Sequence, residues 1–292
     1  MSVKRLGIVG LGLLGTALAE RFAAAGYSLL GYDLDPVARD RLKAMGGQPV
    51  RSSRDVAMGC SRIVLCLPNS DVVKHVISEM LPVAWSSTIL IDTTTGLPDK
   101  MVALAKMVSS QNIGYLDATI GGSSAQVREG DAIVIAGGER KAFDECGEIF
   151  DCFAREKFYV GPCGTGAEVK LAVNMVLGLN RAALAEGLKF AESLGLDSQE
   201  VLKILRASPA YSKVMDTKGD KMLDGDFTPQ AKLSQHLKDV RLMLHIGVKN
   251  GAKLPLTQMH KRILKKAEVD GYGDEDNSAI IKVYDPTHND KS

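Results

Sequence analysis

Short apolar segments alternate with longer segments of helical periodicity along the first half of the chain. The short segments have the length of strands, and they lie at residues 6–9, 28–32, 62–67, 88–92, 115–118, 132–136 and 158–160. The segments between them repeat apolar residues at helical spacing. Strands that alternate with helices are typical of a parallel sheet covered by helices. The first half is therefore predicted to be an α/β domain.

The pattern changes after Gly161. An apolar-periodic segment runs from about residue 165 to 194 without a helix breaker, which is about twice the usual length of a helix. The segments from Asp197 onward look helical, with turn-like residues between them. We therefore expect an α/β domain at residues 1–161 and an all-helical domain at residues 162–292, joined through this long helix. The polar residues 285–292 are expected to form a disordered tail.

Composition adds limits on the partners of the chain. Its 292 residues suit two domains, and the 45% of hydrophobic residues is enough for two cores. The 36 basic residues balance 35 acidic ones, so no broad electric field attracts nucleic acid or an anionic membrane. We therefore expect a small-molecule ligand.

Cysteine usage and the N-terminus indicate a compartment. The five cysteines are scattered, without the CxxC spacing of a zinc or redox site. The N-terminus leads directly into a strand-like segment without a signal-peptide pattern, and no apolar segment is long enough to span a membrane. The sequence thus predicts a soluble cytoplasmic protein with reduced thiols.

A glycine-rich motif follows the first predicted strand. Residues 10–15 fit the pattern GxGxxG and open a predicted helix. The first glycine permits a tight turn, the second leaves room for a pyrophosphate, and the third lets helix and strand pack closely. The helix N-terminus offers amides and a positive dipole end to the phosphates. The motif predicts a Rossmann-type dinucleotide site, with contacts from Gly10, Leu11, Gly12, Leu14 and Gly15.

An acidic residue strengthens this interpretation. The second predicted strand ends in Asp33, at the spacing from the glycines where a carboxylate binds the adenosine ribose hydroxyls. Leu34 and Asp35 follow, with no arginine directly after Asp33 to attract a 2′-phosphate, so NAD is expected rather than NADP. The alternative at this point is a glycine-rich turn beside a solvated aspartate.

Two later strand ends are further candidates for cofactor contacts. Leu67 and Pro68 end the third predicted strand, and Thr95 follows the fourth. The carboxyl ends of parallel strands are the edge where open α/β sheets bind ligands. A threonine in such a place serves equally well as an ordinary turn or helix cap.

A lysine lies near the start of the long predicted helix. Lys170 falls in its second turn, and Asn174 is four residues on, so both side chains project from one face. Desolvation and the positive end of the helix dipole would favour the neutral amine, which could then exchange protons near neutral pH. The alternative is a lysine whose hydrocarbon stem merely lies along the helix surface.

Taken together, these motifs resemble those of the β-hydroxyacid dehydrogenases, the group of 3-hydroxyisobutyrate dehydrogenase, tartronate semialdehyde reductase and glyoxylate reductase, with 6-phosphogluconate dehydrogenase more distant. The glycine loop resembles the family's first motif. Three later segments resemble its substrate-loop, catalytic and late F...KD motifs, in the family's order: residues 117–123 with Gly130 and 137–138, residues 161–174, and residues 227–239. The resemblance covers nearly the whole chain.

The resemblance implies specific roles for individual residues. Lys170 would be the catalytic lysine, and Asn174 would orient the substrate. Thr95 would contact the nicotinamide side of the cofactor, and Lys238 would close over the cofactor from the helical domain. No metal is implied, because a positioned lysine can polarise the carbonyl.

The substrate loop departs from the family pattern. The serine of the family's SGG triplet, which binds the substrate carboxylate, is Gly121 here, and the triplet continues with Gly122 and Ser123. Glyoxylate reductases of the family also have serine at the last position, so Ser123 is expected to take over the carboxylate. The alternative is that Ser123 is a turn residue whose hydroxyl bonds to its own backbone. Thr119 replaces the family's proline, which loosens the loop backbone.

The sequence therefore predicts an NAD-dependent oxidoreductase that transfers a hydride between the cofactor and a small β-hydroxy acid or its semialdehyde or keto acid. A homodimer or homotetramer is expected, and neither the acid nor the direction follows from the residues. Two alternatives stay open. One is an imine reductase on the same scaffold, although its members usually lack the lysine. The other is a binding module that kept the fold and lost turnover.

Overall fold

The computed structural model describes residues 4–285. The predicted tail at 285–292 lies outside the described residues, except for Asp285. The chain forms two compact units, Met1–Lys170 and Leu171–Ser292, so the division falls within the long helix α9 (Thr165–Ser193). Each unit is described below by itself.

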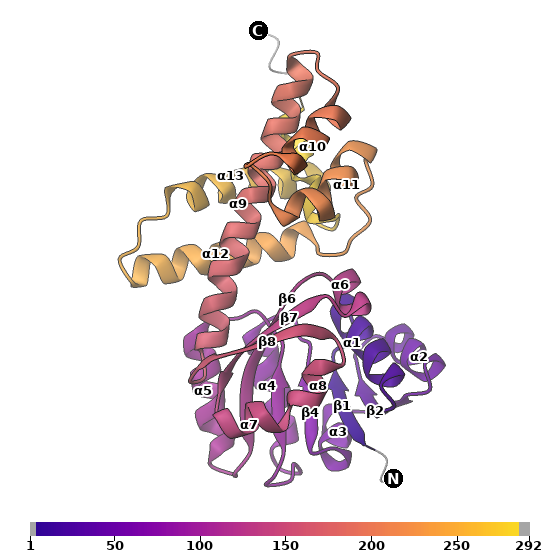
Figure 1. The fold of residues 1–292 in the computed structure, drawn as a ribbon. Coiled ribbons are helices and arrows are strands. Elements are labelled where there is room, and N and C mark those ends of the chain that lie inside the picture. The colour runs from indigo at the N-terminus through magenta and orange to yellow at the C-terminus, as the bar shows by residue number, and fades with distance from the viewer. Residues whose placement is uncertain (1–3, 286–292) are drawn as a thin grey trace. The chain divides into compact units, whose positions relative to one another are not determined.

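A single mixed sheet forms the centre of the first unit (Figure 1). Its strands lie in the order β3-β2-β1-β4-β5-β6-β7-β8. The strands are β1 (Arg5–Val9), β2 (Ser28–Tyr32), β3 (Gln48–Pro49), β4 (Arg62–Leu65), β5 (Ile89–Asp92), β6 (Gly114–Gly121), β7 (Ala132–Gly138) and β8 (Ala154–Gly161). The helices are α1 (Leu13–Ala24), α2 (Pro36–Ala44), α3 (Ser53–Gly59), α4 (Ser70–Met80), α5 (Pro98–Ser109), α6 (Ser124–Glu129), α7 (Arg140–Glu145) and α8 (Gly147–Asp151).

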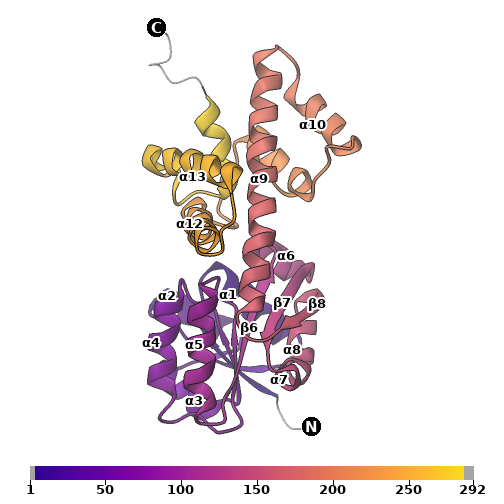
Figure 2. The same ribbon diagram turned by 90° about the vertical axis from the view of Figure 1, so that its left-hand side faces the viewer.

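Successive residues of a strand pack into two separate hydrophobic cores, because neighbouring side chains of a strand point to opposite faces of the sheet. Ile8 and Val64 belong to one core, with residues of α1, α2, α7 and α8. Val9 and Leu65 belong to the other, with residues of α3, α4 and α5. The sheet is thus buried on both faces, which explains the continuously apolar strands (Figure 2).

The architecture confirms the predicted α/β class, with two differences. The short β3 was not predicted, since a two-residue strand leaves no periodic signal. The sheet is also not wholly parallel, because β7 runs antiparallel to β6. The connection at residues 122–131 is too short for the crossover that a parallel pair requires. The other strand pairs in the described chain are parallel.

Helices make up the second unit. After α9 come α10 (Ser198–Ala207), η1 (Met215–Gly219), α11 (Asp220–Asp224), α12 (Leu233–Lys249), α13 (Pro255–Ala267), η2 (Glu268–Tyr272) and η3 (Asn277–Tyr284). Leu188, Leu202, Leu237, Leu264 and Ile280 are buried together in its core. The predicted helix at 165–194 therefore corresponds to α9 within one residue.

The buried carboxylate of Asp276 accepts hydrogen bonds from several segments of the second unit. Asp276 is fully buried and accepts hydrogen bonds from the ammonium of Lys218 at 2.8 and 3.0 Å. It also accepts from the main-chain N–H groups of Gln230, Ala231 and Ser278, and from the Ser278 hydroxyl. Burial works to raise the pKa of Asp276, but Lys218 and these amides outweigh it and hold the pKa below its ordinary value.

We predict that Asp276→Ala lowers the free energy of unfolding by about 3–5 kcal/mol, because it leaves the buried Lys218 ammonium without a counter-charge. Urea unfolding followed by circular dichroism measures the change. Asp274→Ala is the matched control, since that carboxylate is 90% exposed in its ion pair with Lys232 and its loss should leave the unfolding midpoint unchanged. Equal midpoints for the two variants would contradict this role of Asp276.

Candidate functional site

The glycine motif forms a turn that excludes side chains at two positions. Gly10 has φ +93°, and a Cβ there would lie 2.1 Å from the carbonyl oxygen of Cys66. A Cβ on Gly15 would lie 2.0 Å from the carbonyl oxygen of Gly10. At Gly12, by contrast, a Cβ would meet no atom within 4 Å. Gly10 and Gly15 are therefore required by packing, whereas the open space at Gly12 suits close approach of a ligand.

Helix α1 begins at this open space. Its N-cap residue is Gly12, and no side chain caps its first turn. Uncapped amides at a helix N-terminus form a site for phosphate groups. The side chain of Leu11 is buried in the core, and Leu14 is partly buried against it, so Leu11 could contact a cofactor only through its main chain. These features fit the pyrophosphate of a dinucleotide.

Asp33 lies directly after β2, and both of its carboxylate oxygens accept main-chain hydrogen bonds. The N–H of Leu11 donates to Oδ2 at 2.6 Å, and the N–H of Asp35 donates to Oδ1 at 2.9 Å. The first bond links the end of β2 to the glycine loop. Asp33 thus has a defined orientation at the place predicted for the adenosine ribose.

Sequence reasoning missed Arg39, which binds the main chain at Asp33. Its guanidinium donates to the carbonyl oxygens of Asp33, at 2.5 Å, and Leu34, at 3.1 Å. Arg39 is on α2, six positions after Asp33, and a helical turn brings it back to the strand end. The signal in the sequence was an arginine early in the helix after β2, rather than directly after the aspartate.

Threonine hydroxyls join the carboxyl ends of β4 and β5. The Thr93 hydroxyl donates to the carbonyl oxygen of Leu65 at 2.8 Å, and the N–H of Leu67 donates to the Thr94 hydroxyl at 3.3 Å. Both threonines are buried and serve the fold. Leu67 and Thr95 are partly exposed, and Pro68 is exposed, so these three remain accessible to a ligand at this edge.

A buried tyrosine–aspartate pair lies near the same carboxyl ends of the strands. The hydroxyl of Tyr115 on β6 donates to the carboxylate of Asp92, the last residue of β5, at 2.5 Å. Burial raises the pKa of Asp92 to about 6 and that of Tyr115 well above its ordinary value. The pair is enclosed in the protein and connects neighbouring strands.

The start of α9 is fixed to the sheet by Asp117. The Asp117 carboxylate is fully buried and accepts a hydrogen bond from the N–H of Ala167 at 2.9 Å. A Cβ on Gly166 would lie 2.3 Å from the carbonyl oxygen of Asp117, so the contact requires glycine there. The hydroxyl of Thr165, the first residue of α9, donates to the carbonyl oxygen of Pro162 at 2.7 Å. Burial raises the pKa of Asp117, and the Ala167 amide opposes that shift.

Lys170 follows three residues after Ala167 on α9. It is only 7% exposed, which is rare for a lysine, so its side chain does not lie along a solvated surface. Asp117, through the first turn of α9, thereby sets the position of Lys170 relative to the sheet of the first unit.

Asn174, four residues further along α9, belongs to a polar cluster of the second unit. Its side-chain amide donates to the Asp239 carboxylate at 3.0 Å, and both residues are buried. The ammonium of Lys238 lies 3.5 Å from the other oxygen of that carboxylate and is partly exposed. The predicted site residues Asn174 and Lys238 therefore both contact the carboxylate of Asp239. Asp239 itself was not predicted as a site residue, although it lies within the F...KD motif.

The loop at residues 121–123 ends β6 and leads into α6. Gly122 has φ +147°, a conformation that favours glycine. The Ser123 hydroxyl accepts the N–H of Gln126 at 3.3 Å, and the Gln126 side chain accepts the N–H of Ser123 at 3.0 Å. This reciprocal pair is a capping box, so Ser123 has a structural task at the start of α6.

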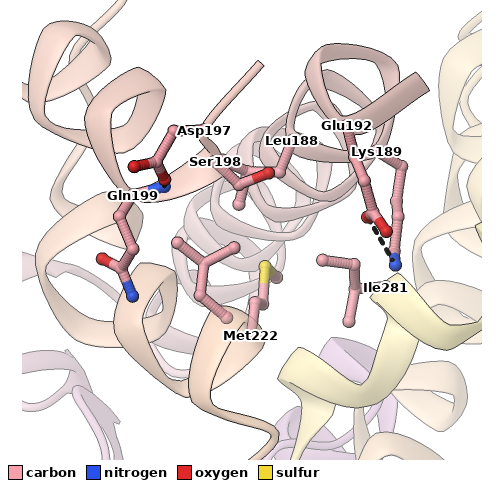
Figure 3. Close-up of a pocket in the computed structure, with 9 residues that line it drawn as sticks. Leu188, Lys189, Glu192, Asp197, Ser198, Gln199, Met222 and Ile281 are labelled. Atoms are coloured by element: carbon pink, nitrogen blue, oxygen red, sulfur yellow. Dashed lines mark hydrogen bonds and ion pairs between the residues drawn. The ribbon is translucent and has the colours of Figure 1, made fainter. Parts of the chain in front are cut away.

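A pocket of about 410 Å³ lies elsewhere, in the second unit (Figure 3). It is lined by residues near the end of α9, the start of α10, α11 and η3: Leu188, Lys189, Glu192, Asp197, Ser198, Gln199, Met222, Leu223 and Ile281. None of the residues predicted to bind cofactor or substrate lines it.

Residues 4–285 contain neither a candidate metal site nor a candidate membrane span. No group of three or more His, Cys, Asp or Glu side chains is placed to hold a metal ion. No helix within these residues is long and apolar enough to cross a membrane.

Comparison with known proteins connects this geometry to a family. Residues 5–161 match the model of the NAD-binding domain of 6-phosphogluconate dehydrogenase. Residues 164–284 match the model described as NAD-binding of NADP-dependent 3-hydroxyisobutyrate dehydrogenase. The two matches meet between β8 and α9.

Relatives of similar length share both parts. The chain is 28% identical to 2-(hydroxymethyl)glutarate dehydrogenase of Eubacterium barkeri, over 96% of this chain and 95% of that protein. It is 27% identical to 2-hydroxy-3-oxopropionate reductase of Escherichia coli, over 98% and 99%. The crystal structure of a 3-hydroxyisobutyrate dehydrogenase from Salmonella typhimurium superimposes with a TM-score of 0.88 and 26% identity, over 96% of this chain and 99% of that one.

The uncapped glycine turn, the oriented acidic residue after β2 and these whole-length matches agree with one another. The chain belongs to the β-hydroxyacid dehydrogenase family and is an oxidoreductase that uses a nicotinamide dinucleotide.

Proposed function

We propose that the protein is an NAD-dependent dehydrogenase that interconverts a small β-hydroxy acid and its semialdehyde or keto acid. The observation that carries this proposal is the buried Lys170, which follows the helix start that Asp117 fixes to the sheet. A buried amine at the ligand-binding side of an α/β sheet is suited to acid/base work. The relatives act on hydroxy acids or their oxidised forms, as their names state.

NAD is the cofactor we propose. Its phosphates would lie against the first turn of α1, next to Gly12, and its adenosine ribose against Asp33. A 2′-phosphate beside the Asp33 carboxylate would be repelled. NADP is the alternative that Arg39 favours, because a guanidinium near this position could bind a phosphate.

The chemistry follows from the residues. NAD, when bound, supplies the acceptor for the hydride that leaves the carbinol carbon. The neutral amine of Lys170 accepts the proton of the substrate hydroxyl during oxidation, and the ammonium returns it during reduction. Asn174, held by Asp239, would orient the same oxygen or the carboxylate. Lys238 would close over the cofactor.

The substrate carboxylate would be bound at residues 121–123. Gly121 and Gly122 can present main-chain N–H groups, since they carry no side chain. The Ser123 oxygen accepts a bond from Gln126, but its hydroxyl hydrogen is still able to donate to a carboxylate. Carboxylate capture and helix capping are thus compatible at Ser123.

The two alternative functions, an imine reductase and a binding module, do not require a lysine at position 170. An imine reductase of this scaffold usually has an acidic or aromatic residue in its place, and a binding module needs no amine there. The burial of Lys170 favours a dehydrogenase over both. NADH oxidation by a panel of small aldehydes, keto acids and cyclic imines separates the three functions.

We also propose a homo-oligomer, a dimer or a tetramer. Large apolar side chains are exposed on the part of α9 that belongs to the second unit, at Val173, Val176, Leu177 and Phe190. Exposed apolar side chains that gather on one element are typical of a surface that packs against another protein. All five cysteines are free thiols, which suits our proposal that the protein acts in the cytoplasm.

Cofactor preference is a direct test of Asp33. We predict that kcat/KM is at least about tenfold higher with NAD than with NADP, and that Asp33→Asn narrows this ratio. Asp144→Asn, which removes the same charge from the exposed surface of α7, should leave the ratio unchanged. A wild-type preference for NADP, abolished by Arg39→Ala, would show that Arg39 rather than Asp33 determines the cofactor.

Removal of the Lys170 amine tests the proposed acid/base. We predict that Lys170→Ala lowers kcat at least about a hundredfold while NAD affinity, measured by calorimetry, changes little. Lys106→Ala, on the exposed side of α5, serves as the control and should keep full activity. A Lys170→Ala enzyme with more than about a tenth of the wild-type kcat at the same pH would disprove the role of Lys170.

A further inference from the structure

A buried arginine of the second unit has no partner for one edge of its guanidinium. Arg181 lies on α9 and is only 2% exposed. Among residues 4–285, neither its Nε nor its Nη2 atom has a hydrogen-bond partner. Burial lowers the pKa of Arg181 to about 10, against the opposing charge of Asp276, so the guanidinium is still charged at neutral pH. A buried charge is costly unless a counter-charge and hydrogen bonds compensate it.

Asp276, the carboxylate whose charge acts on Arg181, does not supply these hydrogen bonds. Its oxygens accept from the Lys218 ammonium, from Ser278 and from main-chain amides. In the part of the chain that the structure describes, no hydrogen bond joins Asp276 to Arg181. The negative charge of Asp276 is already balanced by Lys218, so Arg181 still lacks a counter-charge.

Two buried histidine rings lie against α9 near Arg181. A Cβ on Gly178, three residues before Arg181, would lie 2.3 Å from Nε2 of His236 on α12 and 2.7 Å from Cε1 of His260 on α13. Glycine is therefore required at position 178. The two ring centroids are 5.2 Å apart, and both residues are buried. Within residues 4–285, Nε2 of His260 has no hydrogen-bond partner.

The guanidinium of Arg181 and the ring of His260 are close enough to interact electrostatically. Side chains of a helix lean toward its N-terminus, so Arg181 leans toward Gly178 and the rings. Burial lowers the pKa of His260 to about 4, and the positive charge of Arg181 adds to that shift. The ring is therefore neutral at neutral pH and is able to donate one hydrogen bond from Nε2. Unused donors of α9 and α13 thus lie in the same region of the second unit.

The two atoms of Arg181 without a partner indicate the chemistry of the ligand. Nε and Nη2 lie on one edge of the planar guanidinium, and their parallel N–H groups match the two oxygens of one carboxylate. A water molecule in this place would accept hydrogen bonds but bring no counter-charge. A carboxylate supplies both.

We propose that the second unit contains a buried site for one small carboxylate, held by the Nε and Nη2 groups of Arg181 and by a hydrogen bond from His260. The acid is small, because the side chains around it are buried. When bound, it would join α9 to α13 and so stabilise the second unit. None of these residues is assigned to the cofactor or to the substrate, so the inference is independent of the proposed function.

Thermal unfolding in different sodium salts tests the site. The protein is dialysed until mass spectrometry of a denatured sample finds no small acid, and is then heated in formate, acetate or chloride at equal ionic strength and neutral pH. We expect formate and acetate to raise the unfolding midpoint by at least about 3 °C over chloride, because they bind only the folded state. This difference should vanish in Arg181→Met. Arg241→Met, which removes an exposed guanidinium from α12, should keep it.

Broadening of the NMR signal of ¹³C-labelled formate measures binding without reference to stability. Formate bound at residues 121–123 contributes equally to the wild type and to Arg181→Met, so the difference between the two proteins reports the buried site. We expect more broadening with the wild type and with Arg241→Met than with folded Arg181→Met.

Two results would overturn the inference. One is a wild type, free of bound acid, that unfolds at the same temperature in formate and in chloride and broadens the formate signal no more than Arg181→Met does. Ordered water would then be the partner of Arg181. The other is a formate effect that persists in full in Arg181→Met, which would identify it as a general effect of the salt.

Discussion

The buried carboxylate of Asp117 accepts the contact on which the position of Lys170 depends. It lies on β6, level with the last residue of β5, and accepts the N–H of Ala167 in the first turn of α9. Gly137 and Gly166 let β7 and α9 approach it, since a Cβ on either would lie under 3 Å from an Asp117 oxygen. A charged acceptor at a helix N-terminus is stabilising. The contact joins the sheet of the first unit to the helix that carries Lys170.

Other groups at the carboxyl edge serve the same purpose in the first unit. Asp33 joins the end of β2 to the glycine loop, and Thr93 and Thr94 join the ends of β4 and β5. These bonds keep the strand ends in register, so the few residues left accessible there are preorganised for a ligand. Hydride transfer needs such order, because its rate depends on the alignment of the reacting carbon atoms.

Much of the fold could be predicted because local physics determines it. The glycine turn has fixed steric demands, and the long periodic segment at 165–194 became α9 almost residue for residue. The contacts that were missed are long-range. Asp117 reaches a helix that starts far along the chain, Arg39 returns to Asp33 through a helical turn, and two histidines reach Gly178 from later helices. Side-chain periodicity predicts which face of a helix or strand is buried, but it does not identify the distant residue that lies opposite.

The central claim is that this chain moves a hydride between a hydroxy acid and a nicotinamide. Its most direct test uses NAD and a hydroxy acid deuterated at the carbinol carbon, with mass spectrometry and NMR of the reduced cofactor. We expect one deuterium, at C4 of the nicotinamide, for each molecule of acid oxidised. Reduced cofactor without deuterium, or cofactor that binds tightly and is never reduced by any acid of this class, would contradict it.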